Sequence, residues 1–231
     1  MSPAYFTYLV RCLVFSVHIL KYCLLIFLVS FTAAHSQNVL SAQENALADL
    51  KYFLTQPGDL RADFRQTVSD ADGRVLQQAD GIMSISRPDK FRWQVNSPFS
   101  QLIVGDGEKI WYYDHELKQV SVQPQAGVLS STPAGLLTGG DDLEEHFLLS
   151  PIDYEHNGNK MRWVEAMPKS PDTGFERIRI GFDNGRLQQL QLEDSFGQQT
   201  IFEFSGLERR ALPVGDFRFQ TPDGVEILGQ P

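Results

Sequence analysis

Histidines and acidic residues are the side chains through which this sequence could bind a metal ion or catalyse a reaction. Beyond residue 36 the histidines are His115, His146 and His156. No two of them have the i, i+2 or i, i+4 spacing of paired metal ligands. The sequence also lacks the nucleophile-elbow, phosphate-loop and dinucleotide-binding glycine motifs. We therefore expect no catalytic residue, no metal and no cofactor.

The acidic run DDLEE, residues 141–145, has two interpretations. It is typical of the exposed start of a helix, where negative charge is stabilised by the helix dipole. A cation site, or a carboxylate pair for glycoside hydrolysis, stays open as the alternative, because a sequence does not show which acids meet in space.

The segment KIWYYDHELKQVSV contains three consecutive aromatic residues, Trp111, Tyr112 and Tyr113. These aromatics, together with acidic residues, would suit a periplasmic hydrolase or a glycan-binding module, which is the alternative function. More often, alternate residues of such a strand face the core and the others cover the sheet. We favour the strand interpretation.

The segment SISRPDKFRWQVNSP, residues 84–98, places one arginine on the apolar face of a predicted strand, because side chains alternate between faces. The residues that share this face are Met83, Ile85, Arg87, Phe91, Trp93 and Val95. Arg87 either ends the strand in solvent beside Asp89 or points inward. Inside, it must donate to buried acceptors, because an unpaired buried charge is prohibitive. Carbonyl groups of residues 131–140 could serve, and Arg87 would then be a latch.

The first 36 residues have the pattern of a secretory signal. Their charged residues are Arg11 and Lys21, an apolar run occupies residues 22–31, and the sequence AHS then supplies the small residues of a cleavage site. We expect residues 1–36 to be cleaved and residues 37–231 to form one domain in the periplasm.

The rival interpretation is an uncleaved anchor over residues 12–31, which would place Lys21 within the bilayer at a cost of about 2.5–3.5 kcal/mol. Both cysteines, Cys12 and Cys23, lie in the same segment, so the mature chain would have no disulfide and no cysteine nucleophile. Removing two cations and no acid takes the formal net charge from −9 to −11. This charge argues against nucleic acid as a partner.

The rest of the chain is predicted to be mainly β. SAQENALADLKYFLTQ, residues 41–56, has capping-box and helical spacing. STPAGLLTGG, residues 131–140, predicts a short helix, and residues 141–147 could form a second. Elsewhere polar and apolar residues alternate between turn signals. About ten or eleven short antiparallel strands result, and such a sheet must curl or double over to bury its apolar face.

The stretch of residues 63–122 resembles the LolA family of outer-membrane lipoprotein carrier proteins of Gram-negative bacteria. The matching features are Phe64 followed by Gln66, a glycine-led strand that ends in arginine-proline, an aromatic-x-tryptophan run, and a Gly-Asp-Gly turn ahead of Trp111. STPAGLL is similar to the lid helix of the family, DSFGQQTIFEF to its D-x-x-G-Q-T strand, and FRFQTPDGVEIL to its C-terminal motif.

The resemblance covers residues 41–228, with two departures. Thr221 replaces the first proline of a terminal pair, and the lid carries the small Ala134 and Gly135. An acceptor lipoprotein of similar fold would carry a lipidated cysteine after a lipobox, which this sequence lacks.

The resemblance implies a half-open antiparallel β-barrel whose concave side is covered by helices. It implies a soluble, monomeric periplasmic chaperone that receives acylated lipoproteins from an inner-membrane ABC-type release complex and passes them to a LolB-like outer-membrane acceptor. It also implies that Arg87 bonds to the lid and holds the empty form shut. The expected cavity residues are Phe64, Met83, Ile85, Phe91, Trp93, Trp111, Leu136 and Leu137.

Overall fold

The computed structural model describes residues 46–125, 133–138, 143–155, 158, 161–170 and 174–229. All of them belong to the compact unit Asn45–Pro231. The predicted signal segment and the capping-box residues Ser41 and Glu44 lie outside the described residues. Among the helices that the structure describes, none has both the length and the apolar composition needed to cross a membrane.

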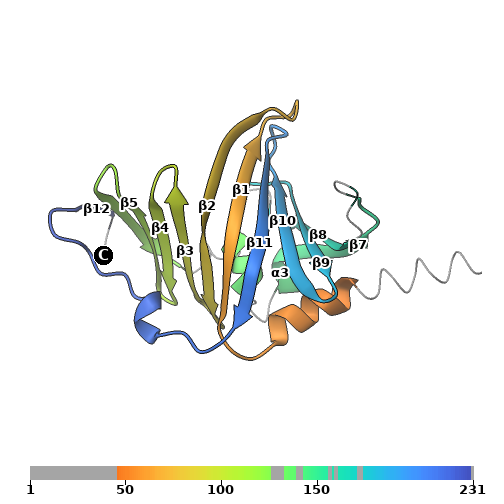
Figure 1. The fold of residues 1–231 in the computed structure, drawn as a ribbon, viewed down its shortest axis with the longest axis horizontal. Coiled ribbons are helices and arrows are strands. Elements are labelled where there is room, and N and C mark those ends of the chain that lie inside the picture. Colours follow the sequence, from red (N-terminus) through yellow and green to blue (C-terminus); the bar gives the residue numbers. More distant parts are fainter. Residues whose placement is uncertain are drawn as a thin grey trace, which may run out of the picture. The chain divides into compact units, whose positions relative to one another are not determined.

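Twelve strands form one sheet (Figure 1). Their bounds are β1 Leu60–Ser69, β2 Val75–Ser86, β3 Lys90–Ser97, β4 Gln101–Asp106, β5 Lys109–Asp114, β6 Gln119–Pro124, β7 Phe147–Ile152, β8 Arg162–Pro168, β9 Arg177–Asp183, β10 Arg186–Glu193, β11 Gln199–Arg209 and β12 Glu226–Gly229. The helical elements are an N-terminal helix described over residues 46–55, α2 Pro133–Thr138, α3 Leu143–His146 and the short 3₁₀ helix η2 Val214–Phe217.

The strand order is β12-β6-β5-β4-β3-β2-β1-β11-β10-β9-β8-β7. Neighbouring strands are antiparallel except β12, which runs parallel to β6. The two edge strands, β7 and β12, lie at opposite ends of this order, so the sheet is open. The predicted mainly-β, half-open architecture is confirmed. The sequence predicted ten or eleven strands instead of twelve, because the four residues of β12 are too few for a visible alternation.

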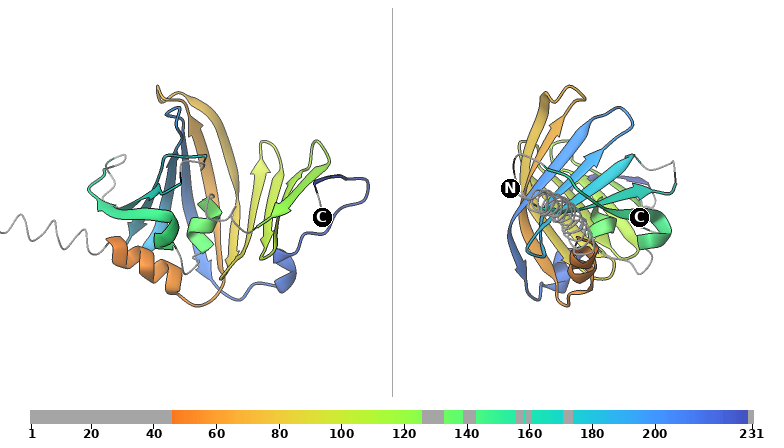
Figure 2. Two further views of the ribbon diagram at one scale, coloured as in Figure 1. Left: turned by 180° about the vertical axis from the view of Figure 1, so that it is seen from behind. Right: turned by 90° about the vertical axis from the view of Figure 1, so that its right-hand side faces the viewer.

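One face of the sheet, called the inner face below, packs against the helices (Figure 2). Alternation along each strand gives this face its apolar character. The strand register also joins residues of neighbouring strands into a continuous row across the inner face. From β1 to β12 the members of this row are Ala62, Met83, Trp93, Ile103, Tyr112, Ser121 and Leu228.

The helices form for the reasons that the sequence predicted. In the N-terminal helix, Ala46, Leu50 and Phe53 recur at helical spacing, and each is 2% exposed. Pro57 ends this pattern, and Gly58 follows with a φ of 90° that favours glycine. The six residues of α2 match the predicted helix 131–140 in their described part, whereas Thr132, Gly139 and Gly140 lie outside the described residues.

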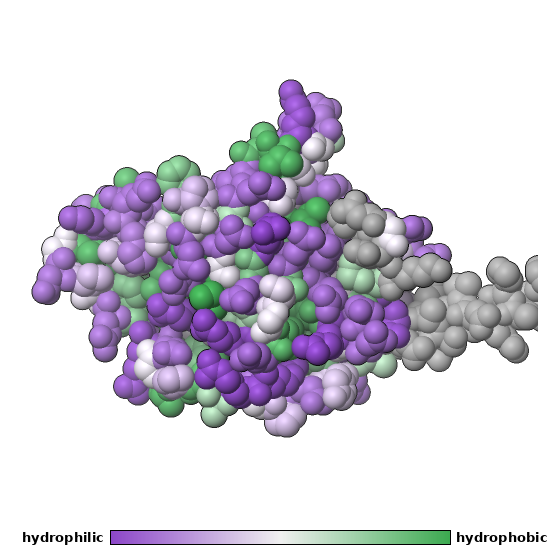
Figure 3. All heavy atoms as spheres, in the orientation of Figure 1, coloured by the Kyte–Doolittle hydropathy of each residue, from purple (hydrophilic) through white to green (hydrophobic). Residues whose placement is uncertain are grey.

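The opposite face, called the outer face below, is partly covered by the C-terminal segment. Phe217 of η2 is 3% exposed, and Phe219 stacks on Trp111 with a centroid separation of 5.3 Å. Figure 3 shows a mostly hydrophilic surface in this view, with apolar side chains gathered near the projecting hairpin tips. Val75 and Phe196, at those hairpins, are 58% and 87% exposed.

Candidate functional site

The candidate site is the apolar inner face beneath α2. The predicted residues that lie in this single core cluster are Phe64, Met83, Ile85, Phe91, Trp93, Leu136 and Leu137. Leu136 and Leu137 of α2 are 0% exposed, and α2 packs against β2 and β3. The structure thus brings seven of the eight predicted cavity residues together.

Aromatic rings form the centre of this cluster. Phe64 and Trp93 lie 4.7 Å apart between ring centroids, and Trp93 meets Phe202 edge to face at 5.0 Å. Phe204 is also within the cluster, 6.3 Å from Trp93. Phe202 and Phe204 were not among the predicted cavity residues, although the alternation in TIFEF places both on the same face of β11.

Two glycines give the rings their positions. Phe64 lies opposite Gly81 in β2, and Phe91 lies opposite Gly105 in β4. A Cβ atom at either glycine would fall 2.3 Å from a carbon of the facing ring. The absence of a side chain at these two positions therefore lets each ring lie flat over the neighbouring strand.

Arg87 follows β2 directly and reaches α2. Its Nη2 donates a hydrogen bond of 3.1 Å to the carbonyl oxygen of Leu137, and its guanidinium carbon lies 5.1 Å from the ring centroid of Phe53. It makes no ion pair with Asp89 among the described residues. Its Nε and Nη1 are buried and have no hydrogen-bond partner within the described part of the chain. Burial, and then the charge of Arg209, lower the pKa of Arg87 to about 10, so the side chain stays charged at neutral pH.

Arg209, at the end of β11, makes a corresponding contact with the N-terminal helix. Its Nη2 donates 3.0 Å to the carbonyl oxygen of Phe53, near the end of that helix, and its guanidinium carbon lies 5.4 Å from the Phe53 ring centroid. Burial lowers the pKa of Arg209 as well. Arg209 was not among the predicted site residues. The signal was its spacing of two from Leu207, which repeats the spacing of Arg87 from Ile85.

Trp111 does not belong to the inner face, which corrects the prediction that it lines the cavity. It stacks on Phe219, and its indole Nε1 donates 2.9 Å to Oδ2 of Asp106. The physical reason is that side chains alternate between the two faces along β5. Tyr112 takes the inner-face position opposite Ile103, so Trp111, the residue before it, must point outward.

The Trp111 contact also influences Asp106. Burial alone would raise the pKa of this carboxyl group, but hydrogen bonds from the indole and from the backbone amides of Lys109 and Glu108 outweigh burial and lower it. Asp106 therefore fixes the turn between β4 and β5 as a carboxylate and is no candidate for acid catalysis at neutral pH.

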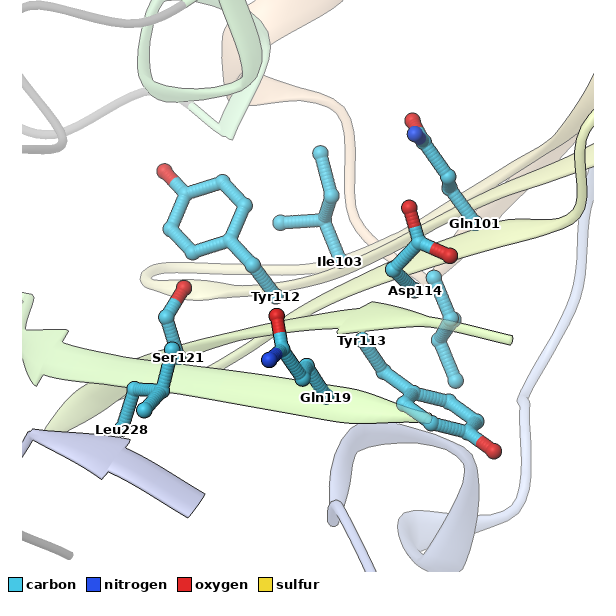
Figure 4. Close-up of a pocket in the computed structure, with 9 residues that line it drawn as sticks. Gln101, Ile103, Tyr112, Tyr113, Asp114, Gln119, Ser121 and Leu228 are labelled. Atoms are coloured by element: carbon cyan, nitrogen blue, oxygen red, sulfur yellow. The ribbon is translucent and has the colours of Figure 1, made fainter. Parts of the chain in front are cut away.

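A pocket of about 260 Å³ lies at the β4–β6 end of the sheet (Figure 4). Its lining residues are Gln101, Leu102, Ile103, Tyr112, Tyr113, Asp114, Gln119, Ser121 and Leu228. Figure 4 shows Tyr112 and Ile103 on one side of the sheet and Tyr113 on the other. Burial raises the pKa of Tyr112, so its hydroxyl is neutral and can accept the 3.4 Å hydrogen bond from Gln123.

The side chains that the sequence offers as possible metal ligands do not converge in the part of the chain that the structure describes. No three His, Cys, Asp or Glu residues in it are close enough together to hold a metal ion. The ring of His115 contacts Ser100 at 3.3 Å, and His146 ends α3. Within the acidic run, Glu144 and Glu145 are exposed in the first turn of α3, while His156 lies outside the described residues.

Comparison with known proteins gives consistent results. Residues 58–220 match the family described as outer membrane lipoprotein carrier protein LolA. A curated outer-membrane lipoprotein carrier protein of Nitrosospira multiformis is 42% identical over 212 residues, covering 91% of this chain and 98% of the relative. Its counterpart in Dechloromonas aromatica is 46% identical over 192 residues, with coverage of 83% and 91%.

The likeness to a solved structure supports the fold. An uncharacterized conserved protein from Thermus thermophilus has a TM-score of 0.52 at 11% identity, covering 80% of this chain and 97% of that chain. At this level of identity the similarity concerns the fold alone.

Proposed function

The chain belongs to the family of outer membrane lipoprotein carrier proteins, LolA, and from this premise we propose that it is a periplasmic chaperone that shelters the acyl chains of lipoproteins on the inner face of its sheet. The observation that carries the proposal is the helix α2. Its Leu136 and Leu137 cover the apolar cluster, and Arg87 fastens it through one hydrogen bond.

The free energy of the cargo explains why such a cover is needed. At about 0.8 kcal/mol per buried methylene, an acyl chain of roughly 15 methylenes gains on the order of 12 kcal/mol in an apolar site. Release of the acyl chain into water is therefore negligible. The acyl chain must pass directly from one apolar site to the next, so the inner face has to open during contact with a partner.

The helix α2 is suited to open. Six residues are too few for a helix that is stable on its own, so α2 depends on its packing and on Arg87. A hydrogen bond from a charged donor contributes about 1.5–3 kcal/mol. The empty protein thus stays closed at moderate cost to opening, and the return of α2 to its closed position helps to expel the acyl chain during hand-off. In this proposal Arg87 is the latch, and Phe64, Met83, Ile85, Phe91 and Trp93 line the site.

Family membership also supports the proposed partners. These are acylated lipoproteins as cargo, an ABC-type release complex in the inner membrane as the donor, and a LolB-like lipoprotein in the outer membrane as the acceptor. The chain has no nucleotide-binding motif, so energy for loading has to come from the donor. We further propose that residues 1–36 are a cleaved signal and that the mature protein works as a monomer.

The hydrolase or glycan-binding alternative is not proposed. Trp111 and Tyr113 both pack against Phe219 on the outer face, at centroid distances of 5.3 and 5.9 Å. They therefore do not form a free platform for a sugar ring.

The test is release of radiolabelled lipoprotein from spheroplasts. Purified residues 37–231 should move labelled lipoprotein into the supernatant as a soluble complex with the protein, and buffer or an unrelated acidic protein should not. The labelled lipoprotein that is released in this complex should then be transferred to outer-membrane vesicles that contain the acceptor. Equal release with and without the protein would refute the proposed function.

A further inference from the structure

The inner face changes character abruptly between β3 and β4. In the row described above, Ala62 and Met83 are 0% exposed and Trp93 is 8% exposed. Farther along the row, Ile103 and Tyr112 are half-buried and Ser121 is exposed. The row thus leads from the covered cluster beneath α2 into the open pocket of Figure 4 without leaving the inner face.

A second row, one step along the strands, changes from apolar to polar at the same point. Phe64, Gly81 and Val95 of β1, β2 and β3 are followed in register by Gln101, Asp114 and Gln119 of β4, β5 and β6. The apolar part of the inner face and the pocket are therefore continuous, and they differ in the chemistry that they offer.

The pocket offers neutral hydrogen-bonding groups beside an aromatic ring. The amides of Gln101 and Gln119, the hydroxyl of Ser121 and the ring of Tyr112 line it. The charged residue among its described lining residues is Asp114, whose Oδ1 accepts bonds of 2.9 and 3.0 Å from the amides of Glu116 and Leu117. Gln119 donates to Glu226 of β12 at 3.3 Å. These lining residues include no lysine or arginine, so the chemistry of the pocket does not suit a phosphate headgroup.

We propose that this pocket binds the peptide that follows the acylated residue of the cargo, while the acyl chains lie beneath α2. The inference rests on the proposed function and adds to it a site for the polar part of the ligand. An extended peptide carries alternating N–H and C=O groups, which glutamine side chains and a serine hydroxyl can pair. Its apolar side chains can pack on Tyr112 and Leu228. A lipopeptide requires an apolar region for its acyl chains and an adjoining region of amide and hydroxyl groups for its peptide, on one continuous surface.

The experiment compares two probes that share an acyl chain. One is an acylated cysteinyl lipopeptide with a short neutral peptide, and the other is a fluorescent fatty-acid analogue without peptide. The variant Ser121→Trp fills the pocket from an exposed position, and Gln101→Ala removes one amide. Gln77→Ala, an exposed glutamine of β2 that does not line the pocket, is the matched control.

We expect both pocket variants to weaken lipopeptide binding about fivefold and to leave fatty-acid binding within about twofold of the parent. Gln77→Ala should change neither affinity. An unchanged lipopeptide affinity in both pocket variants would overturn the inference, as would equal losses for the two probes. If the parent protein binds neither probe, the proposed function itself fails, which is a distinct result.

Discussion

Arg87 and Arg209, which lie at the ends of strands on either side of β1, hold their guanidinium groups against the same ring, that of Phe53. The two guanidinium carbons are 5.1 and 5.4 Å from its centroid. Arg87 bonds to the carbonyl of Leu137 in α2, and Arg209 bonds to the carbonyl of Phe53 in the N-terminal helix. An arginine at a strand end therefore fastens each of these two helices to the sheet, and Arg162 of β8 holds the N-terminal helix at a second point through Asp49.

The first prediction concerns the latch. Arg87→Leu removes the hydrogen bond to α2 and the cost of opening, so acylated cargo should still bind but be held longer and passed on poorly. Because a factor of ten corresponds to about 1.4 kcal/mol, loss of one charged hydrogen bond should slow transfer to the acceptor by about tenfold. The measurement is the transfer rate from preformed carrier–lipoprotein complex to acceptor. Normal hand-off by this variant would rule out the latch.

The second prediction concerns the N-terminal helix. Arg209→Gln should remove the bond to the Phe53 carbonyl and speed amide hydrogen exchange in residues 46–55 by an amount equivalent to roughly 1–2 kcal/mol. Exchange in α2 should change less, because Arg87 remains. Arg162→Gln is a useful comparison, since Arg162 holds Asp49 of the same helix at 2.5 Å. Unchanged exchange in Arg209→Gln would contradict the fastening role.

Much of the fold was predictable because alternation is visible in long strands. The helix over 131–140 followed from its proline and apolar residues. The spacing of Arg87 with Met83 and Ile85 left its direction open between solvent and the interior, and the family resemblance favoured the inward contact with α2 that the structure shows. The family resemblance supplied the arrangement of helices over the sheet, which alternation does not specify.

The errors have equally specific causes. In WYYD the residues Trp111, Tyr112 and Tyr113 are all aromatic, so this segment shows no alternation of apolar and polar residues. The sequence therefore did not indicate which of them faces inward, and Trp111 was wrongly assigned to the cavity. The register with β4 decides it in favour of Tyr112. Arg209 was missed because regular alternation from Phe202 and Phe204 places it on the outer face. A bulge between Arg61 and Asp63 shifts the pairing of β1 with β11, so that Arg209 lies opposite Leu60 on the inner face.

The third prediction concerns pH. The pKa of Asp106 is lower in the folded protein than its ordinary value of 3.8. The carboxylate therefore stabilises the folded protein. This stabilisation is fully present at a pH above the unfolded-state pKa of Asp106 and is lost as the pH falls through its folded-state pKa. The difference in unfolding free energy between the parent and Asp106→Asn should be constant near neutral pH and shrink below about pH 4. Urea unfolding followed by tryptophan fluorescence measures this difference in unfolding free energy. A difference that does not depend on pH would refute the lowered pKa of Asp106 in the folded protein.

The fourth prediction concerns the aromatic cluster. In Gly81→Ala the new Cβ would fall 2.2 Å from the backbone oxygen of Gln94 and 2.3 Å from the Phe64 ring. The backbone oxygen is held in the sheet, so the strands must separate or the ring must move. We expect a loss of about 1–3 kcal/mol in unfolding free energy. A shift in tryptophan emission should accompany it, because Trp93 packs on Phe64.

The matched control for this substitution is Gly215→Ala. Gly215 has no heavy atom within 4 Å of the position its Cβ would take and no positive φ. Its replacement should change the unfolding free energy by less than about 0.5 kcal/mol. If Gly81→Ala also weakens binding of the fatty-acid analogue while Gly215→Ala does not, the position of the Phe64 ring matters for the ligand as well as for stability. Two variants of equal stability and equal ligand affinity would show that the glycine opposite Phe64 does not position the ring.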